Sequence, residues 1–202
     1  MSAPRRLIVG ITGATGTIFG IRLLEMLRDT DIETHLVLSK WAARTLVEET
    51  TFTVEDVQRL ATVVYPSTDQ GAAISSGSFV TMGMAIVPCS VRTLAAIAHG
   101  IGDNLIHRAA DVVLKERRRL VLAVREAPFN DIHLENMLKL SRMGAVICPP
   151  LPAFYNRPET IDDLVNYSVA RLLDQLDIHL KVGNRWGGLG EAARRSPAGT
   201  KR

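Results

Sequence analysis

Short apolar runs alternate along this chain with longer segments in which apolar residues recur every three or four positions. The short runs predict strands, and the longer segments predict amphipathic helices. The predicted strands cover 7–11, 33–39, 62–65, 83–88, 120–124 and 145–148. The predicted helices cover 18–27, 41–49, 54–60, 91–99, 104–118, 132–140 and 161–176, with Ser90 and Asp103 as the N-caps of the fourth and fifth.

The alternation of strands and helices predicts an α/β fold with a doubly wound parallel sheet. The strands are apolar enough to be covered on both faces, as parallel strands are. The 202 residues suit one such domain. We place it at residues 1–189 and interpret residues 190–202 as a basic, disordered tail.

Charge and composition exclude several classes of protein. The formal net charge is +3. The tail alone carries +3, from four cations (Arg194, Arg195, Lys201 and Arg202) and one anion (Glu191), so residues 1–189 are neutral and nucleic acid is not an expected partner. No apolar run reaches the ~20 residues that span a membrane, and the chain starts without signal-peptide architecture. With two cysteines and no metal-ligand spacing, we expect a cytoplasmic protein without a metal site.

Polar residues follow the predicted strands at one edge of the sheet. In a doubly wound sheet, ligands bind beyond the carboxyl ends of the strands. The residues predicted there are Gly13-Ala14-Thr15, Ser39, Pro88-Cys89-Ser90, Arg125-Glu126 and Pro149-Pro150. Hydroxyls, charges and a glycine turn on the same edge predict a binding site.

The turn Thr12–Gly16 resembles a nicotinamide-dinucleotide fingerprint, but three features count against that interpretation. Phe19 stands where the third glycine is expected, and the second strand ends in Ser39 instead of an acidic residue. Tyr167 is followed four residues later by Arg171 instead of the lysine of short-chain dehydrogenases. A mononucleotide phosphate, held by Thr15, Ser39 and the helix that Ser90 starts, suits the hydroxyl-rich edge better.

Two groups of charged residues remain open at this point. Arg125 and Glu126 end an apolar strand, where neighbours are expected to point to opposite faces; Glu126 is a candidate acid/base, or the partner of a nearby arginine. Arg108, Asp111 and Lys115 share one helix face, either as an ion-pair row or as binders of a second anion.

Seven segments together resemble the flavin prenyltransferase family, the UbiX-type proteins that include B subunits associated with hydroxyarylic acid decarboxylases. These segments are GITGATGTIFGIRLLEML, ETHLVLSKWA, ISSGSF, PCSVRTLAAIAHG, NLIHRAADVVLKERRRLVLAVREAP, HLENMLKLSRMGAVICPP and PAFYNRPETIDDLVNYSVARLLDQL. The resemblance implies a Rossmann-like, flavodoxin-related fold and dodecamers with sites between subunits. It also implies transfer of a dimethylallyl group from dimethylallyl phosphate to N5 and C6 of reduced FMN, without a metal. The product would be the prenylated FMN cofactor of UbiD-type decarboxylases, such as those of ubiquinone biosynthesis.

The resemblance also assigns roles to residues. It implies FMN binding by nine residues: Gly13, Ala14, Thr15, Ser39, Ser90, Val91, Arg92, Thr93 and Arg125. It implies prenyl-phosphate binding by Tyr155 and Arg171, with Ser76, Gly77, Arg108, Lys115 and Trp186 as further substrate-site residues, and an acid/base role for Glu126. Thr15 and Val124 depart from the family, which often has serine and proline there.

Two other functions stay open beside this one. The chain could be a non-catalytic FMN-binding subunit of an aromatic acid decarboxylase complex, or a flavin-dependent decarboxylase acting alone. A flavin that gains a prenyl group would distinguish the transferase from both.

Overall fold

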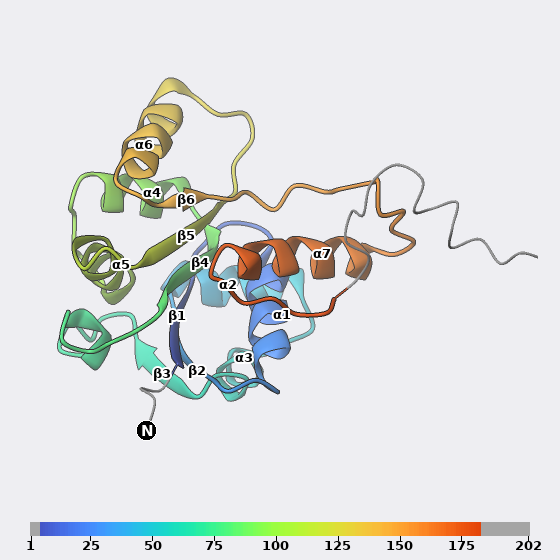
Figure 1. Cartoon of the computed structure of the whole chain (residues 1–202), viewed down its shortest axis with the longest axis horizontal. Coiled ribbons are helices and arrows are strands. Elements are labelled where there is room, and N and C mark those ends of the chain that lie inside the picture. Colours follow the sequence, from blue (N-terminus) through green and yellow to red (C-terminus); the bar gives the residue numbers. More distant parts are fainter. Residues whose placement is uncertain (1–4, 183–202) are drawn as a thin grey trace, which may run out of the picture.

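The computed structural model describes residues 5–182, which form a six-stranded parallel sheet with helices on both faces (Figure 1). The strand order is β3-β2-β1-β4-β5-β6. The strands are β1 (Arg5–Ile11), β2 (Ile32–Leu38), β3 (Val63–Pro66), β4 (Gly83–Cys89), β5 (Arg119–Val124) and β6 (Val146–Ile147). The predicted single α/β domain with a doubly wound sheet is confirmed.

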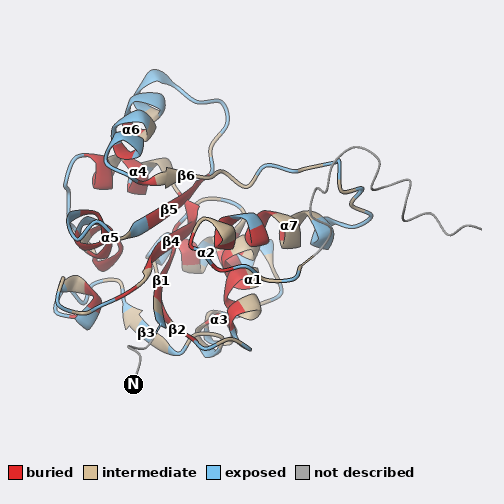
Figure 2. Ribbon diagram, viewed as in Figure 1, coloured by how far each residue is buried: buried red, intermediate tan, exposed pale blue. Residues whose placement is uncertain are grey.

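Alternating side chains of the strands build two separate cores, one on each face of the sheet. On β1, Leu7, Val9 and Ile11 point into one core and Ile8 points into the other, as the two-residue period of a strand requires. The first core is closed by α1 (Thr17–Leu27), α2 (Lys40–Glu49), α3 (Val54–Arg59) and α7 (Ile161–Asp174). The second is closed by α4 (Val91–Ala98), α5 (Leu105–Lys115) and α6 (Asp131–Arg142). Buried residues accordingly concentrate on the strands and on the inward faces of the helices (Figure 2).

The connections reverse direction between β1 and β4, which are hydrogen-bonded neighbours in the sheet. From β1 the chain builds outward through β2 to β3, and then returns to add β4, β5 and β6 on the other side. This order is the one that leaves a crevice beyond the carboxyl ends of the two central strands. Gly20 keeps α1 close to this crevice, because a Cβ there would lie 2.3 Å from the Val87 carbonyl oxygen.

The fifth helix differs from its predicted span. Asn104 caps it, accepting a hydrogen bond from the His107 amide (3.1 Å), and Asp103 contacts the His107 side chain instead. The helix ends at Lys115, and Arg117 then adopts a left-handed conformation (φ 56°) that no α-helix accommodates. A short 3-10 helix, η1 (Ala73–Ser75), also lies between β3 and β4, where no helix was predicted.

Candidate active site

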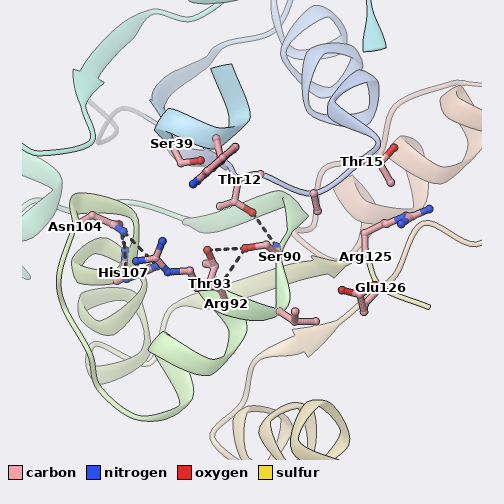
Figure 3. A pocket seen from close by; sticks show the side chains of 14 residues that line it. Thr12, Thr15, Ser39, Ser90, Arg92, Thr93, Asn104, His107, Arg125 and Glu126 are labelled. Carbon is pink, nitrogen blue, oxygen red and sulfur yellow. Dashed lines mark hydrogen bonds between the residues drawn. The ribbon is translucent and has the colours of Figure 1, made fainter. Parts of the chain in front are cut away.

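A cavity of about 480 Å³ lies at the carboxyl ends of the central strands. Most of its lining residues lie in the segments that follow β1, β2, β4 and β5, as the strand order predicts, and two come from the start of α5 (Figure 3). Fourteen residues line it: Thr12, Gly13, Ala14, Thr15, Ser39, Trp41, Ser90, Val91, Arg92, Thr93, Asn104, His107, Arg125 and Glu126. All nine residues predicted to bind FMN are among them, together with Glu126.

Thr12 fixes the floor of this cavity by joining the ends of β1 and β4. Its hydroxyl donates to the Pro88 carbonyl oxygen (2.8 Å) and accepts from the Ser90 amide (2.8 Å). The side chain is 1% exposed, so both bonds are shielded from water. This link holds the glycine turn and the start of α4 in one fixed relation.

Close packing between the glycine turn and α2 depends on Gly13. A Cβ at Gly13 would lie 2.3 Å from the Cβ of Trp41, in the first turn of that helix. An alanine there would push the helix away from the turn. The start of α2 therefore reaches the cavity because residue 13 is glycine.

Three helices begin at the cavity, and each is capped by a short polar side chain. Ser39 accepts from the Ala42 amide (3.0 Å), Ser90 accepts from the Thr93 amide (3.2 Å), and Asn104 caps α5. The first two amides of each helix have no acceptor within their own helix. Amide donors and the positive ends of three helix dipoles therefore converge on a space suited to an anionic, hydrogen-bonding ligand.

Arg125 and Glu126 follow β5, which ends at Val124. The expectation that they end the strand is wrong, because they lie just beyond it, and both line the cavity. The Glu126 carboxylate accepts from the Ala127 amide (3.1 Å). Neither side chain makes an ion pair within residues 5–182, so the alternative that Glu126 only neutralises an arginine fails in the described subunit.

Sequence reasoning missed Glu49, a carboxylate at the other side of the glycine turn. It accepts from the amides of Gly16 (2.8 Å) and Thr17 (3.1 Å) and from the Thr17 hydroxyl (3.1 Å), at the start of α1. Burial alone would raise the pKa of Glu49, but hydrogen bonds from Thr15, Gly16 and Thr17 outweigh it and lower that pKa. A lone acid at the end of a helix gives no sequence signal, since its target lies 33 residues away.

Asn104, His107 and Trp41 were also missed as lining residues. Trp41 follows the predicted strand-end residue Ser39 by two positions, so that proximity was available in the sequence. Asn104 and His107 come from the start of α5, and no strand end predicts their position. Only the tertiary packing of the chain brings these two residues to the cavity.

Six predicted substrate residues do not line this cavity in the described subunit: Ser76, Gly77, Arg108, Lys115, Tyr155 and Arg171. Arg108 pairs with Asp111 (2.8 Å) and Lys115 pairs with Glu116, so the face they share carries ion pairs here. Arg171 pairs with Asp174 (2.7 Å), and the Tyr155 hydroxyl contacts that of Tyr167. Trp186 and the tail 190–202 lie outside the described residues.

Comparison with known proteins identifies the relatives of this fold and site. A family model described as Flavoprotein matches residues 1–173. A probable UbiX-like flavin prenyltransferase of Bacillus subtilis is 55% identical over 184 residues, which is 91% of this chain and 90% of that protein. The chain belongs to the UbiX-type flavin prenyltransferases. The flavin prenyltransferase UbiX of Escherichia coli is 56% identical over 187 residues, covering 91% of this chain and 99% of the relative.

Two solved structures of this family are also close to the described fold. The crystal structure of AnUbiX (PadA1) in complex with FMN and dimethylallyl pyrophosphate has a TM-score of 0.91 and 52% identity, over 92% of this chain and 99% of that one. A dodecameric FMN-dependent UbiX-like decarboxylase from Escherichia coli has a TM-score of 0.89 and 55% identity, over 91% and 100% of the two chains. Both confirm the family that the sequence motifs indicate.

Proposed function

We propose that this protein joins a dimethylallyl group from dimethylallyl phosphate to N5 and C6 of reduced FMN, making the prenylated flavin that UbiD-type decarboxylases use. The observation that carries this proposal is the cavity itself, which gathers the predicted FMN residues and Glu126 in one UbiX-type fold. Relatives named flavin prenyltransferase support the reaction, and a neighbour bound to FMN and dimethylallyl pyrophosphate supports the substrates.

The residues of the cavity suit FMN. Gly13, Ala14 and Thr15 have small side chains, so that their backbone can lie close to the ligand. Ser39 and the segment Ser90–Thr93 offer hydroxyls and amides. Convergent amide donors match an anionic phosphate and the polar edge of an isoalloxazine ring. When bound, reduced FMN supplies the nucleophilic ring atoms of the reaction. We assign these residues and Arg125 to binding it.

Arg125 and Glu126 are the residues we assign to the chemistry. Loss of an allylic phosphate develops negative charge on the leaving group, and the guanidinium of Arg125 at the cavity can stabilise such charge. Closing the second ring bond releases a proton, and we assign Glu126 to accept it through its carboxylate oxygens. Because no ion pair within residues 5–182 neutralises either group, both remain available to the cavity.

We propose that further substrate-site residues reach the cavity from a second subunit. Arg108 and Lys115 lie on α5, with Ser76 and Gly77 beside that helix, and within the described subunit this group does not line the cavity. A dodecamer with sites between subunits would bring it to the cavity of a neighbouring copy. A dodecameric relative of 55% identity supports this arrangement.

The decisive experiment mixes the protein anaerobically with reduced FMN and dimethylallyl phosphate, followed by mass spectrometry of the extracted flavin. We expect a flavin heavier by one five-carbon prenyl unit. A parallel reaction with dimethylallyl pyrophosphate establishes which donor is used. Unmodified flavin with both donors would overturn the proposal and leave an FMN-binding subunit; carbon dioxide release from an aryl acid without a partner protein would instead favour a decarboxylase.

We place this reaction in the cytoplasm. None of the helices between residues 5 and 182 combines the length and the hydropathy of a membrane-spanning helix. Fractionation of the native cells with an antibody to the protein tests the location.

A further inference from the structure

A titratable cluster lies at the end of the cavity away from Arg125 and Glu126 (Figure 3). Its centre is His107, whose side chain is 3% exposed and forms part of the cavity wall. The same imidazole also lines a second cavity of about 240 Å³ between α4 and α5. The proposed prenyl transfer gives His107 no task, so its burial at a ligand site needs another explanation.

Two charged residues surround the imidazole from different elements. His107 Nδ1 lies 2.5 Å from Asp103 Oδ1, and the other carboxylate oxygen of Asp103 lies 3.6 Å from the Arg92 guanidinium. Arg92 belongs to the first turn of α4 and itself lines the FMN cavity. Arg92, Asp103 and His107 therefore form a chain of charged and titratable groups across this end of the cavity.

The surroundings of His107 in the described subunit favour the neutral imidazole. Burial lowers the pKa of His107; the Asp103 carboxylate opposes that shift and Arg92 adds to it. Arg108 and Asp111, which line the smaller cavity on the other side, pair with each other and so offset one another's field. With Nδ1–H donated to Asp103, Nε2 is the ring atom that can gain a proton, and its other neighbour is the Asn104 side-chain nitrogen at 3.3 Å.

A dianion entering this end of the cavity would favour the protonated form of His107 over the neutral form. The starts of α4 and α5 and the Arg92 side chain already favour negative charge here. A phosphate beside the imidazole stabilises its cationic form, as any nearby opposite charge does. Protonation on Nε2 converts the imidazole into a donor at both nitrogens, one for Asp103 and one for the ligand.

We propose that His107, oriented by Asp103, binds the FMN phosphate by taking up one proton from solvent on Nε2, so that FMN affinity rises as the pH falls toward 6. The inference rests on the proposed binding of FMN in this cavity. It makes His107 a phosphate-binding residue and Asp103 a positioning residue. The consequence is that release of the flavin is coupled to release of a proton.

The test measures the dissociation constants of FMN and riboflavin by fluorescence titration of the flavin-free full chain between pH 6 and 8. For FMN we expect the wild-type affinity to rise by about two- to tenfold from pH 8 to pH 6, relative to His107→Gln. The ratio to the variant cancels the titration of the phosphate itself, which has a pKa near 6. Riboflavin lacks the phosphate, so its affinity should not depend on residue 107.

Two further variants separate proton linkage from a structural role. Asp103→Asn removes the carboxylate that raises the His107 pKa, so we expect the pH dependence to persist with its midpoint at lower pH. His99→Gln is the matched control, because His99 is an exposed histidine at the end of α4 outside the cavity lining, and it should behave as wild type. Thermal melts check that each variant is folded.

The outcomes distinguish this inference from the proposed function. Equal losses of FMN and riboflavin in His107→Gln, or a pH profile unchanged by both His107→Gln and Asp103→Asn, would overturn the role of His107 while leaving FMN binding intact. Failure of the wild type to bind any flavin would instead remove the proposed function. If His107→Gln does not fold, the midpoint shift in Asp103→Asn decides, and its absence overturns the inference.

Discussion

Glu126 is the residue on which the proposed chemistry depends most directly. Glu126→Gln keeps the shape of the side chain and its contact with the Ala127 amide, but removes the base that accepts the ring proton. We expect turnover to fall by about 10²-fold or more, in the range typical of a lost general base, while FMN binding stays unchanged. Single-turnover formation of the prenylated flavin measures the turnover, and flavin titration measures FMN binding.

Glu135→Gln, on the exposed side of α6, is the control for this substitution and should keep full turnover. Full activity of Glu126→Gln would remove the residue from the acid/base role. A parallel loss of FMN affinity would indicate that the carboxylate supports the pocket instead of the reaction.

Glu49 is a second single residue with a testable effect, which in this case is on the stability of the fold. Its carboxylate accepts three donors at the start of α1, where Gly16 offers no side-chain cap. Because the folded pKa is lowered, the stabilisation is present above the ordinary glutamate pKa and is lost as the pH falls through the folded value. The carboxylate is largely exposed, so we expect Glu49→Gln to lower Tm by only about 1–3 °C at pH 7, with a smaller difference near pH 4.

Differential scanning fluorimetry at both pH values measures this effect. Glu48→Gln is the neighbouring control, since the Glu48 side chain makes no ion pair or hydrogen bond to another residue of the described chain. An equal difference at pH 7 and pH 4 would show that the charge of Glu49 does not stabilise the helix start.

At the scale of the element, a residue that caps a helix at the cavity is expected both to stabilise that helix and to contribute to ligand binding. Ser90 accepts from the Thr93 amide at the start of α4, inside the cavity. Thr160 accepts from the Asp163 amide at the start of α7 and does not line that cavity. We expect Ser90→Ala and Thr160→Ala each to cost about 1 kcal/mol of stability, and only Ser90→Ala to weaken FMN binding.

Chemical denaturation and flavin titration of the two alanine variants check this prediction together. Equal FMN affinities would show that Ser90 serves only as a cap. The pair is informative because the two substitutions remove the same kind of hydrogen bond from helices at different distances from the ligand.

The helices and strands were also the features that the sequence predicted most completely. Periods of two and three to four residues located all six strands and seven helices of the described chain, because each element buries one face or both. Strand ends then predicted the cavity, since parallel strands place their carboxyl ends at one edge. Asn104 and His107 escaped that logic, because a helix start reaches the cavity only through packing. Glu49 escaped it because the end of α2 reaches the start of α1 in the same way.

At the scale of the whole molecule, the described subunit separates two groups of predicted site residues. One group lines the cavity, and the group on and beside α5, which includes Arg108 and Lys115, does not. Residues 1–189 carry no net formal charge, so assembly of many copies meets little overall repulsion from that part. A closed symmetric oligomer can then bring the α5 group of one copy to the cavity of the next.

Subunit mixing tests this arrangement. Glu126→Gln and Arg108→Ala are each expected to be nearly inactive alone, because every site lacks one group. In randomly mixed oligomers, roughly a quarter of the sites would combine an intact Glu126 from one copy with an intact Arg108 from another, and activity should return to about that fraction. Co-expression with two affinity tags, purification of the doubly tagged oligomer and the prenylation assay measure it.

The matched control mixes Glu126→Gln with Arg125→Ala, whose residues line the same cavity of one subunit. Every cavity in that mixture carries one of the two substitutions, so no site regains both groups and activity should stay near the level of the single variants. Recovery with Arg108→Ala but not with Arg125→Ala would place Arg108 across the subunit boundary. Failure of both mixtures, in oligomers shown to contain both subunits, would mean that each copy supplies its own Arg108 after a rearrangement of α5.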